Sequence, residues 1–225
     1  ARAQTAGRGR RGHKWDSTAG NLLLSIVVRP NVNPAKYSGL AAVCGLAVLE
    51  TLEKQGLATE IGLKWPNDLV ARGRKLGGIL VEAARDNEGK PFAVCGIGVN
   101  VSYTPSEVPD DGLAAIGLSD LHESVPSVDT LLDAAYHTVM DAVDAWAEQL
   151  NTLAEDAGPL APIHDEYVAR LNWIDEHVIA RSPAGDELAR GIFRTVDDFG
   201  RASIETDDGL HAFHFEEASL RPLNG

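Results

Sequence analysis

Two apolar segments of strand length, residues 76–84 and 92–101, flank a short polar loop at residues 87–90. This pattern predicts a β-hairpin, and therefore a sheet that is at least partly antiparallel. Both segments contain glycines within the apolar run. Glycine inside a strand marks a place where another group packs close to the backbone. We therefore expect another group to pack close to the backbone at these glycines.

Other patterns up to residue 172 predict further strands and several helices. The expected strands are 21–28, 61–65 and 69–71, and the expected helices are 35–55, 128–150 and 162–172. Asn33-Pro34 supplies an N-cap followed by proline at the first helical position, and Gly56 suits the helix end. Residues 103–125 are polar and rich in proline and aspartate, and are expected to be mostly loop.

The spacing changes after residue 172. Five short apolar segments follow one another closely, at residues 178–181, 188–194, 202–206, 211–215 and 219–222. Such spacing predicts a small β-barrel. We therefore expect an α+β fold, with a mixed, mainly antiparallel sheet and helices on one side in domain 1–172, and a β-barrel in domain 173–225.

Composition limits the function classes. Hydrophobic residues make up 44% of the 225 residues and charged residues 24%, the balance of a globular protein. No apolar run reaches the length of a membrane span, so no membrane association is predicted. The net charge is −13, yet residues 1–15 contain five Lys or Arg and no acid. Such local polarity favours a small anionic ligand over a long polyanion.

The two cysteines, Cys44 and Cys95, lie in apolar surroundings. Two cysteines cannot form a disulfide scaffold at this size, and ligands for a cysteine–histidine zinc site are lacking. They are interpreted as buried, reduced thiols of a cytoplasmic protein.

Residues 4–12, QTAGRGRRG, alternate small residues with arginines. Glycine lets the backbone approach a ligand, and arginine grips carboxylate or phosphate at two points. The segment therefore predicts a loop that closes over an anion. Taken alone, it fits a disordered basic tail equally well.

Two further motifs carry charged residues at turns. KWPNDL, residues 64–69, places Asp68 at a tight turn, where it could hold Mg²⁺ near nucleotide phosphates or simply cap its own backbone. RKLGGILVE, residues 74–82, places Lys75 before two glycines, as a fixed cation or as a solvent-exposed hairpin lysine. CGIGVNV, residues 95–101, is not a dinucleotide-binding fingerprint, because no helix opens after its glycines.

Together and in this order, QTAGRGRRG, KWPNDL, KLGGILVE and GIGVNV resemble the catalytic domain of biotin protein ligases. The C-terminal β-module resembles the small SH3-like domain of that family, so the resemblance covers essentially the whole chain. It implies that biotin and ATP, with Mg²⁺, form biotinyl-5′-AMP and pyrophosphate. Biotin is then transferred to a lysine of a biotin carboxyl carrier protein.

The resemblance also implies roles for single residues. Lys75 and Arg10 match the catalytic cations. The implied biotin-binding residues are Gln4, Arg8, Arg10, Lys75, Gly78, Gly96 and Gly98; the implied ATP-binding residues are Arg10, Arg11, Trp15, Asn67, Lys75, Asn100 and Arg221; Asp68 is the implied Mg²⁺ ligand.

The chain departs from the family pattern in two places. His13 stands where the family has arginine. An upstream strand–helix segment with a Ser-Thr-Asn motif that contacts biotin is expected to be missing, so the biotin pocket would lose a wall. No helix-turn-helix DNA-binding domain is visible in the sequence. Dimerisation through the sheet is common in the family, but nothing in the sequence decides it.

Three alternatives stay open. A lipoate or octanoate ligase shares the fold superfamily, although the GRGRRG and KWPND motifs favour biotin. A nucleic-acid-binding module would use the Arg-Gly segment, but a net charge of −13 disfavours it. The third alternative is an inactive fragment of a ligase.

Overall fold

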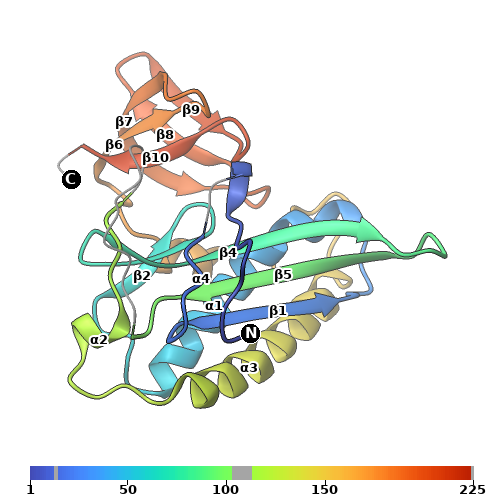
Figure 1. Cartoon of the computed structure of the whole chain (residues 1–225). Coiled ribbons are helices and arrows are strands. Elements are labelled where there is room, and N and C mark those ends of the chain that lie inside the picture. The colour runs from blue at the N-terminus through green and yellow to red at the C-terminus, as the bar shows by residue number, and fades with distance from the viewer. Residues whose placement is uncertain (13–14, 103–112, 224–225) are drawn as a thin grey trace.

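The computed structural model describes residues 1–12, 15–102 and 113–223, and places two five-stranded sheets within them. His13 lies outside the described residues. Figure 1 shows the larger sheet backed by helices, with the smaller C-terminal sheet stacked above one end of it.

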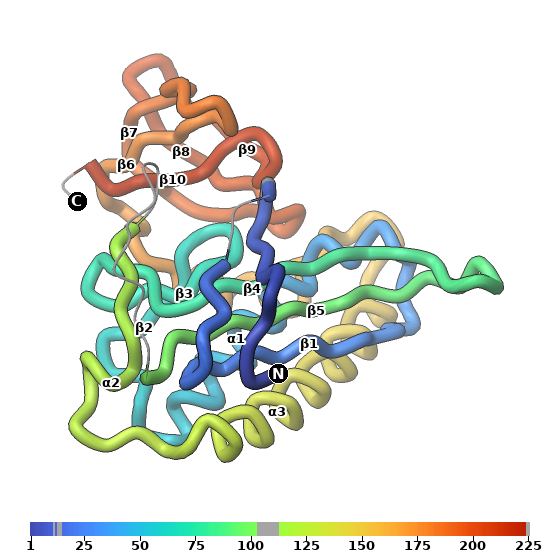
Figure 2. The backbone as a smooth tube through the Cα atoms, viewed as in Figure 1, coloured from blue at the N-terminus to red at the C-terminus, as the bar shows by residue number. Residues whose placement is uncertain are grey.

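The larger sheet has strand order β1-β5-β4-β3-β2, and all its neighbouring strands pair antiparallel. Its strands are β1 Leu22–Val28, β2 Ile61–Lys64, β3 Asp68–Ala71, β4 Arg74–Arg85 and β5 Pro91–Val99. The expected hairpin is confirmed as β4 and β5, which run side by side and are joined by a loop at one end (Figure 2). Among the described residues, parallel pairing is confined to two isolated bridges, Leu63 with Leu171 and Lys75 with Ala115.

Helices α1 Leu40–Lys54 and α3 Val128–Leu150 pack on each other and against this sheet (Figure 1). The expected helix 35–55 begins differently: its first turn is the 3-10 helix η2 Pro34–Gly39. A Cβ at Gly39 would lie only 2.8 Å from the carbonyl oxygen of Pro159, so the 3-10 turn packs closely against the backbone at Pro159. A short helix, α2 Leu118–Leu121, interrupts the loop expected at residues 103–125, of which residues 103–112 lie outside the described part of the chain.

The segment Pro34–Lys54 is long and apolar enough, by length and composition alone, to cross a membrane. However, 72% of its apolar window is buried inside the structure. Its apolar composition is therefore that of a central core helix.

The smaller sheet has strand order β10-β6-β7-β8-β9 and is also antiparallel throughout. Its strands are β6 His177–Arg181, β7 Glu187–Val196, β8 Ala202–Thr206, β9 Gly209–Phe213 and β10 Ser219–Pro222. Helix α4 His164–Arg170, shorter than expected, precedes it. The predicted α+β fold with a C-terminal β-domain is confirmed; the division after residue 172 stays a prediction.

Hydrogen bonds join the turn between β7 and β8 to the rest of the chain. The indole N–H of Trp65, a residue only 2% exposed, donates to the carbonyl of Gly200 at 2.9 Å. Asp198 accepts from the backbone N–H of Gly158 through its side chain and from that of Leu160 through its carbonyl, at 2.9 and 2.8 Å. The position of the turn after β2 is therefore tied to the C-terminal sheet.

Replacing Trp65 with Phe tests this connection. The variant loses one donor and leaves the Gly200 carbonyl without it, so we expect the free energy of unfolding to fall by about 1 kcal/mol. Urea unfolding measures the change, with Trp173→Phe, a half-buried tryptophan, as the control. Equal losses in both variants would contradict a specific contribution of the Trp65–Gly200 bond.

Candidate functional site

The site is built on the turn between β2 and β3. Lys64 and Asp68 face each other across the hairpin as its last pair. The turn between them is fixed from several sides: the Tyr167 hydroxyl donates to the carbonyl of Pro66 at 3.1 Å, and the Asn67 carbonyl accepts from the N–H of Ile79 at 2.8 Å. The side chains of Lys64 and Asp68 are therefore held at a fixed place.

Asp68 makes ion pairs with two lysines. Its Oδ1 lies 2.6 Å from Lys75 Nζ, and its Oδ2 lies 3.2 Å from Lys64 Nζ. The Lys64 side chain is 4% exposed and that of Asp68 is 13% exposed, whereas that of Lys75 is 32% exposed. The cluster thus has a buried end at Lys64 and an open end at Lys75.

Burial and charge shift the pKa values of this cluster. Burial alone would raise the pKa of Asp68, but the charges of Lys75 and Lys64 outweigh it and hold that pKa well below its usual range. Burial lowers the pKa of Lys64 to about 8, and the charges of Arg221 and Lys75 add to this effect while Asp68 opposes it. At neutral pH the Asp68 carboxylate is therefore ionised and the Lys64 ammonium carries charge.

The backbone of Lys75 is fixed by the segment before α2. Its N–H donates to the carbonyl of Ala114 at 2.7 Å, and its carbonyl accepts from the N–H of Ile116 at 2.9 Å. The Asn100 side chain donates to the same carbonyl of Lys75 and to that of Ile116, at 3.4 and 3.1 Å. Asn100 is only 2% exposed, so its amide serves this internal network.

The glycines of β4 and β5 define which face of the sheet carries the site. Gly78 and Gly98 are direct partners in the two strands, so they share a face. A Cβ at Gly78 would lie 3.3 Å from Asp68 Oδ1, and one at Gly98 would lie 2.7 Å from the ring of Trp15. The next residue, Ile79, instead points to Gly45 of α1. The site therefore lies on the face opposite the helices.

Trp15 covers this face. Its ring packs on Gly98, and the ammonium of Lys75 lies 5.6 Å from the ring centroid. The Trp15 indole N–H is buried and has no hydrogen-bond partner among the described residues. The close approach explains why β5 has glycine at position 98, as its sequence pattern predicts.

The Gly-Arg segment runs along this face. The backbone N–H of Gln4 donates to the carbonyl of Ser17 at 3.2 Å, and the backbone N–H of Trp15 donates to the carbonyl of Gly7 at 3.1 Å. The segment ends in the short 3-10 turn η1 Arg10–Gly12. A Cβ at Gly7 would lie 2.2 Å from Ser17 Oγ, so this position requires glycine.

Arg10 connects the two sheets through the site. Its guanidinium donates to Asn67 Oδ1 at 3.3 Å and to the carbonyl of Phe215 at 2.7 Å, and it lies 5.0 Å from the centre of the Phe215 ring. These contacts bring a cation of the Gly-Arg segment to the turn that carries Asp68.

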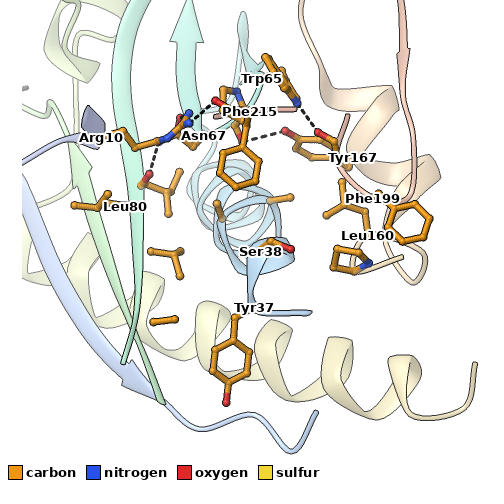
Figure 3. A pocket seen from close by; sticks show the side chains of 18 of the residues that line it. Arg10, Tyr37, Ser38, Trp65, Asn67, Leu80, Leu160, Tyr167, Phe199 and Phe215 are labelled. Carbon is orange, nitrogen blue, oxygen red and sulfur yellow. Dashed lines mark hydrogen bonds between the residues drawn. The ribbon is translucent and has the colours of Figure 1, made fainter. Parts of the chain in front are cut away.

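A cavity of about 250 Å³ opens beside Arg10 (Figure 3). Arg10 and Asn67 lie at one end of it, and the rings of Phe215 and Tyr167 lie beside them. Apolar residues of η2, α1 and β4 line the rest, with Leu160 and Phe199 on the C-terminal side. The cavity extends from the site toward the helices.

Some predicted residues lie together and others do not. One group gathers around Asp68: Arg10, Trp15, Asn67, Lys75, Gly78 and Gly98. Arg8 lies outward, 3.7 Å from Glu82 and largely exposed, and the Gln4 side chain accepts from Ser17 at 2.8 Å. Gly96 packs only loosely, with Leu80 O 3.5 Å from an added Cβ.

The last two predicted residues are less directly placed. Arg221, on β10, is near enough for its charge to lower the pKa of Lys64, and its guanidinium donates to the Leu220 carbonyl at 2.9 Å. The backbone of Arg11 belongs to η1, and its side chain lies outside what the structure describes.

The sequence analysis assigned no role to Lys64, Tyr167 or Phe215. Lys64 had a signal, since it stands four residues before Asp68 across a tight turn. Phe215 contributes a backbone carbonyl, which carries no sequence signal.

The residues present do not fit Asp68 as a Mg²⁺ ligand. Both of its oxygens face lysine ammonium groups, and hard cations require several oxygen ligands. Across the residues with described positions, no group of three or more His, Cys, Asp or Glu is placed to hold a metal ion.

Comparison with known proteins agrees with this architecture. Residues 1–100 match the family model described as the biotin/lipoate A/B protein ligase family, and residues 174–221 match the biotin protein ligase C terminal domain. The chain is similar to a biotin--[acetyl-CoA-carboxylase] ligase of Mycobacterium tuberculosis, at 36% identity over 91% of this chain and 71% of the relative. A ligase of the same name from Paracoccus denitrificans is 34% identical, over 89% and 80%.

Among solved structures, a biotin protein ligase from Aquifex aeolicus in complex with biotin and ATP superposes with a TM-score of 0.77. Its sequence is 25% identical, and the match covers 98% of this chain and 87% of that one. The fold and the two matched family models define a biotin/lipoate ligase-type protein. Within that class, the chain belongs to the biotin protein ligase family.

Replacing Asp68 with Asn tests the electrostatics of the site. The change leaves Lys64 buried beside a neutral amide, so we expect a loss of about 3 kcal/mol in the free energy of unfolding at neutral pH. Because folding holds the pKa of Asp68 below its ordinary 3.8, its contribution is complete above that pH. This contribution to stability is lost as the pH falls through the lower pKa that Asp68 has in the folded protein.

Urea unfolding of the wild type and the Asp68→Asn variant over a range of pH measures this. The difference in the free energy of unfolding between them should narrow in acid, below the ordinary carboxyl pKa. Asp144→Asn, an exposed acid of α3, is the control and should change little. A difference that does not depend on pH would contradict the two-lysine ion pair.

Proposed function

We propose that this chain uses ATP to ligate biotin to a lysine of a biotin carboxyl carrier protein, through biotinyl-5′-AMP, with release of pyrophosphate and AMP. Membership of the biotin protein ligase family supports the reaction class. One structural observation supports it most: the Lys75 ammonium stands at the open end of a cationic cluster, on the glycine-lined face of the sheet.

The first step joins two anions. An oxygen of the biotin carboxylate attacks the α-phosphorus of ATP, and pyrophosphate leaves. Fixed positive charge lowers this barrier, because it opposes the repulsion between the reactants and stabilises the transition state. We assign this role to Lys75 and Arg10, which contact Asp68 and Asn67, two neighbouring residues of the same turn.

The glycines leave room for the ligand. Gly78 has no side chain beside Lys75 and Asp68, so the backbone there can approach the head group of biotin, while Gly98 packs against the ring of Trp15 nearby. We propose Gln4, Arg8 and Gly96 as the outer parts of the same pocket. Their present contacts, with Ser17, Glu82 and Leu80, lie farther from Lys75.

The nucleotide side is proposed around Trp15, Asn67 and Arg221, with Arg11 of η1 beside them. The unpartnered indole N–H of Trp15 could donate to a ligand. Asn100 contributes indirectly in this proposal, because its side chain holds the backbone of Lys75. No step is assigned to a metal ion held by Asp68.

The second step needs protection from water. The mixed anhydride formed in the first step is hydrolysed if water enters, before the carrier lysine can attack its carbonyl carbon and release AMP. Trp15 and the segment leading to Arg10 lie over the site and would exclude water. We propose the carrier protein as the acceptor of biotin, and a cytoplasmic location, from membership of the family.

Biotin-dependent exchange of pyrophosphate into ATP tests the function. Wild type should support exchange with biotin but not with lipoate, which also distinguishes the two ligase classes. Lys75→Ala should lower the exchange rate by a factor of about 100 or more, because it removes a charge that acts in the transition state. Lys90→Ala, at a 69% exposed hairpin lysine, is the matched control and should retain the rate.

Exchange with lipoate in place of biotin would contradict the substrate assignment. An unchanged rate in Lys75→Ala would contradict the assignment of the site. If wild type and both variants exchange pyrophosphate at the same rate without added biotin or lipoate, the exchange comes from an unrelated activity.

A further inference from the structure

We infer that Lys64, whose side chain is only 4% exposed, is a positioning residue that makes the Lys75 ammonium available to an anionic substrate by sharing the carboxylate of Asp68. The inference rests on the proposed function and deepens it. It assigns a role to a buried charge that the proposed reaction does not otherwise use.

The geometry of the three side chains carries the inference. Lys64 and Asp68 are paired across the hairpin end, and each oxygen of Asp68 is directed to a different lysine. Among the described residues, Asp68 is the one hydrogen-bond acceptor of the Lys64 ammonium. The carboxylate therefore lies between the two ammonium groups, and its orientation is fixed from both sides.

The balance of charge gives the arrangement its consequence. Two ammonium groups and one carboxylate leave one net positive charge, and the exposed member of the cluster is Lys75, at 32% against 4% for Lys64. Without the charge of Lys64, Lys75 and Asp68 would form a pair with no net charge. An incoming carboxylate or phosphate would then have to compete with Asp68 for Lys75 without the opposing charge of Lys64.

A purely structural role does not explain a lysine at this place. Burying an ammonium group costs free energy even when it is paired, and an apolar side chain of similar volume often serves as well or better. Arg221 of β10 adds a further positive charge near Lys64 rather than a compensating negative one. The other titratable group at this turn, Tyr167 of α4, stays neutral because burial raises its pKa.

The test compares an anionic ligand with its neutral counterpart. Biotin carries a carboxylate, and biotinol carries a primary alcohol in its place. Isothermal titration calorimetry of the full chain at neutral pH gives the dissociation constants of both for wild type and Lys64→Met. Methionine approximates the length of lysine without its charge, and Asp68 keeps Lys75 as a partner, so the variant should fold.

We expect Lys64→Met to weaken biotin binding about tenfold and biotinol binding by less than about twofold. The matched control, Lys54→Met, removes the same charge from a 62% exposed lysine of α1 that pairs with Glu50. It should change neither constant. Thermal unfolding followed by circular dichroism checks that both variants are folded.

Equal weakening of both ligands would overturn the inference and indicate a structural role for Lys64. Unchanged binding of both ligands would also overturn it, while leaving the proposed function intact. A wild type that binds neither ligand would instead contradict the proposed function, and the inference would fail with it.

Discussion

The site depends on one carboxylate held between two lysines. Asp68 is deep enough in the protein that its charge must be compensated, and it is compensated by Lys64 from the interior and by Lys75 from the open side. This interaction fixes where Lys75 stands and keeps a positive charge at the edge of the glycine-lined face. The other features of the site lie around that charge: Trp15 covers the face, and Arg10 adds a further cation.

The rest of the fold keeps this carboxylate in place. The turn that presents Asp68 is held by Tyr167 of α4, by Ile79 of β4 and, through Trp65, by the C-terminal turn at Gly200. Arg10 adds a contact from the N-terminal segment to Phe215. The C-terminal part of the chain therefore contacts this turn and Arg10 through the backbone carbonyls of Gly200 and Phe215.

The sequence predicted the parts of this arrangement that depend on local pattern. The β4–β5 hairpin followed from its apolar runs and polar loop, and the glycine at position 98 correctly indicated a close neighbour on the sheet. The resemblance to a known family singled out Lys75 and Arg10, which the structure brings to the same turn.

What the sequence did not predict depends on long-range contacts. The enclosure of Asn100, the carbonyl of Phe215 beside Arg10 and the burial of Lys64 arise from segments far apart in the chain. The 3-10 turn at the start of the first helix follows from packing against Pro159, which local propensity does not encode.

In the proposed reaction, Lys75 and Arg10 together bind the reacting phosphate. A crystal structure of the chain with biotinol-5′-AMP, a stable analogue of the adenylate, tests this most directly. We predict a phosphate oxygen within hydrogen-bond distance of Lys75 Nζ, with the guanidinium of Arg10 beside the same group and the biotin rings beside Gly78. Binding of the analogue in the apolar cavity lined by α1, with its phosphate away from Lys75, would contradict the account.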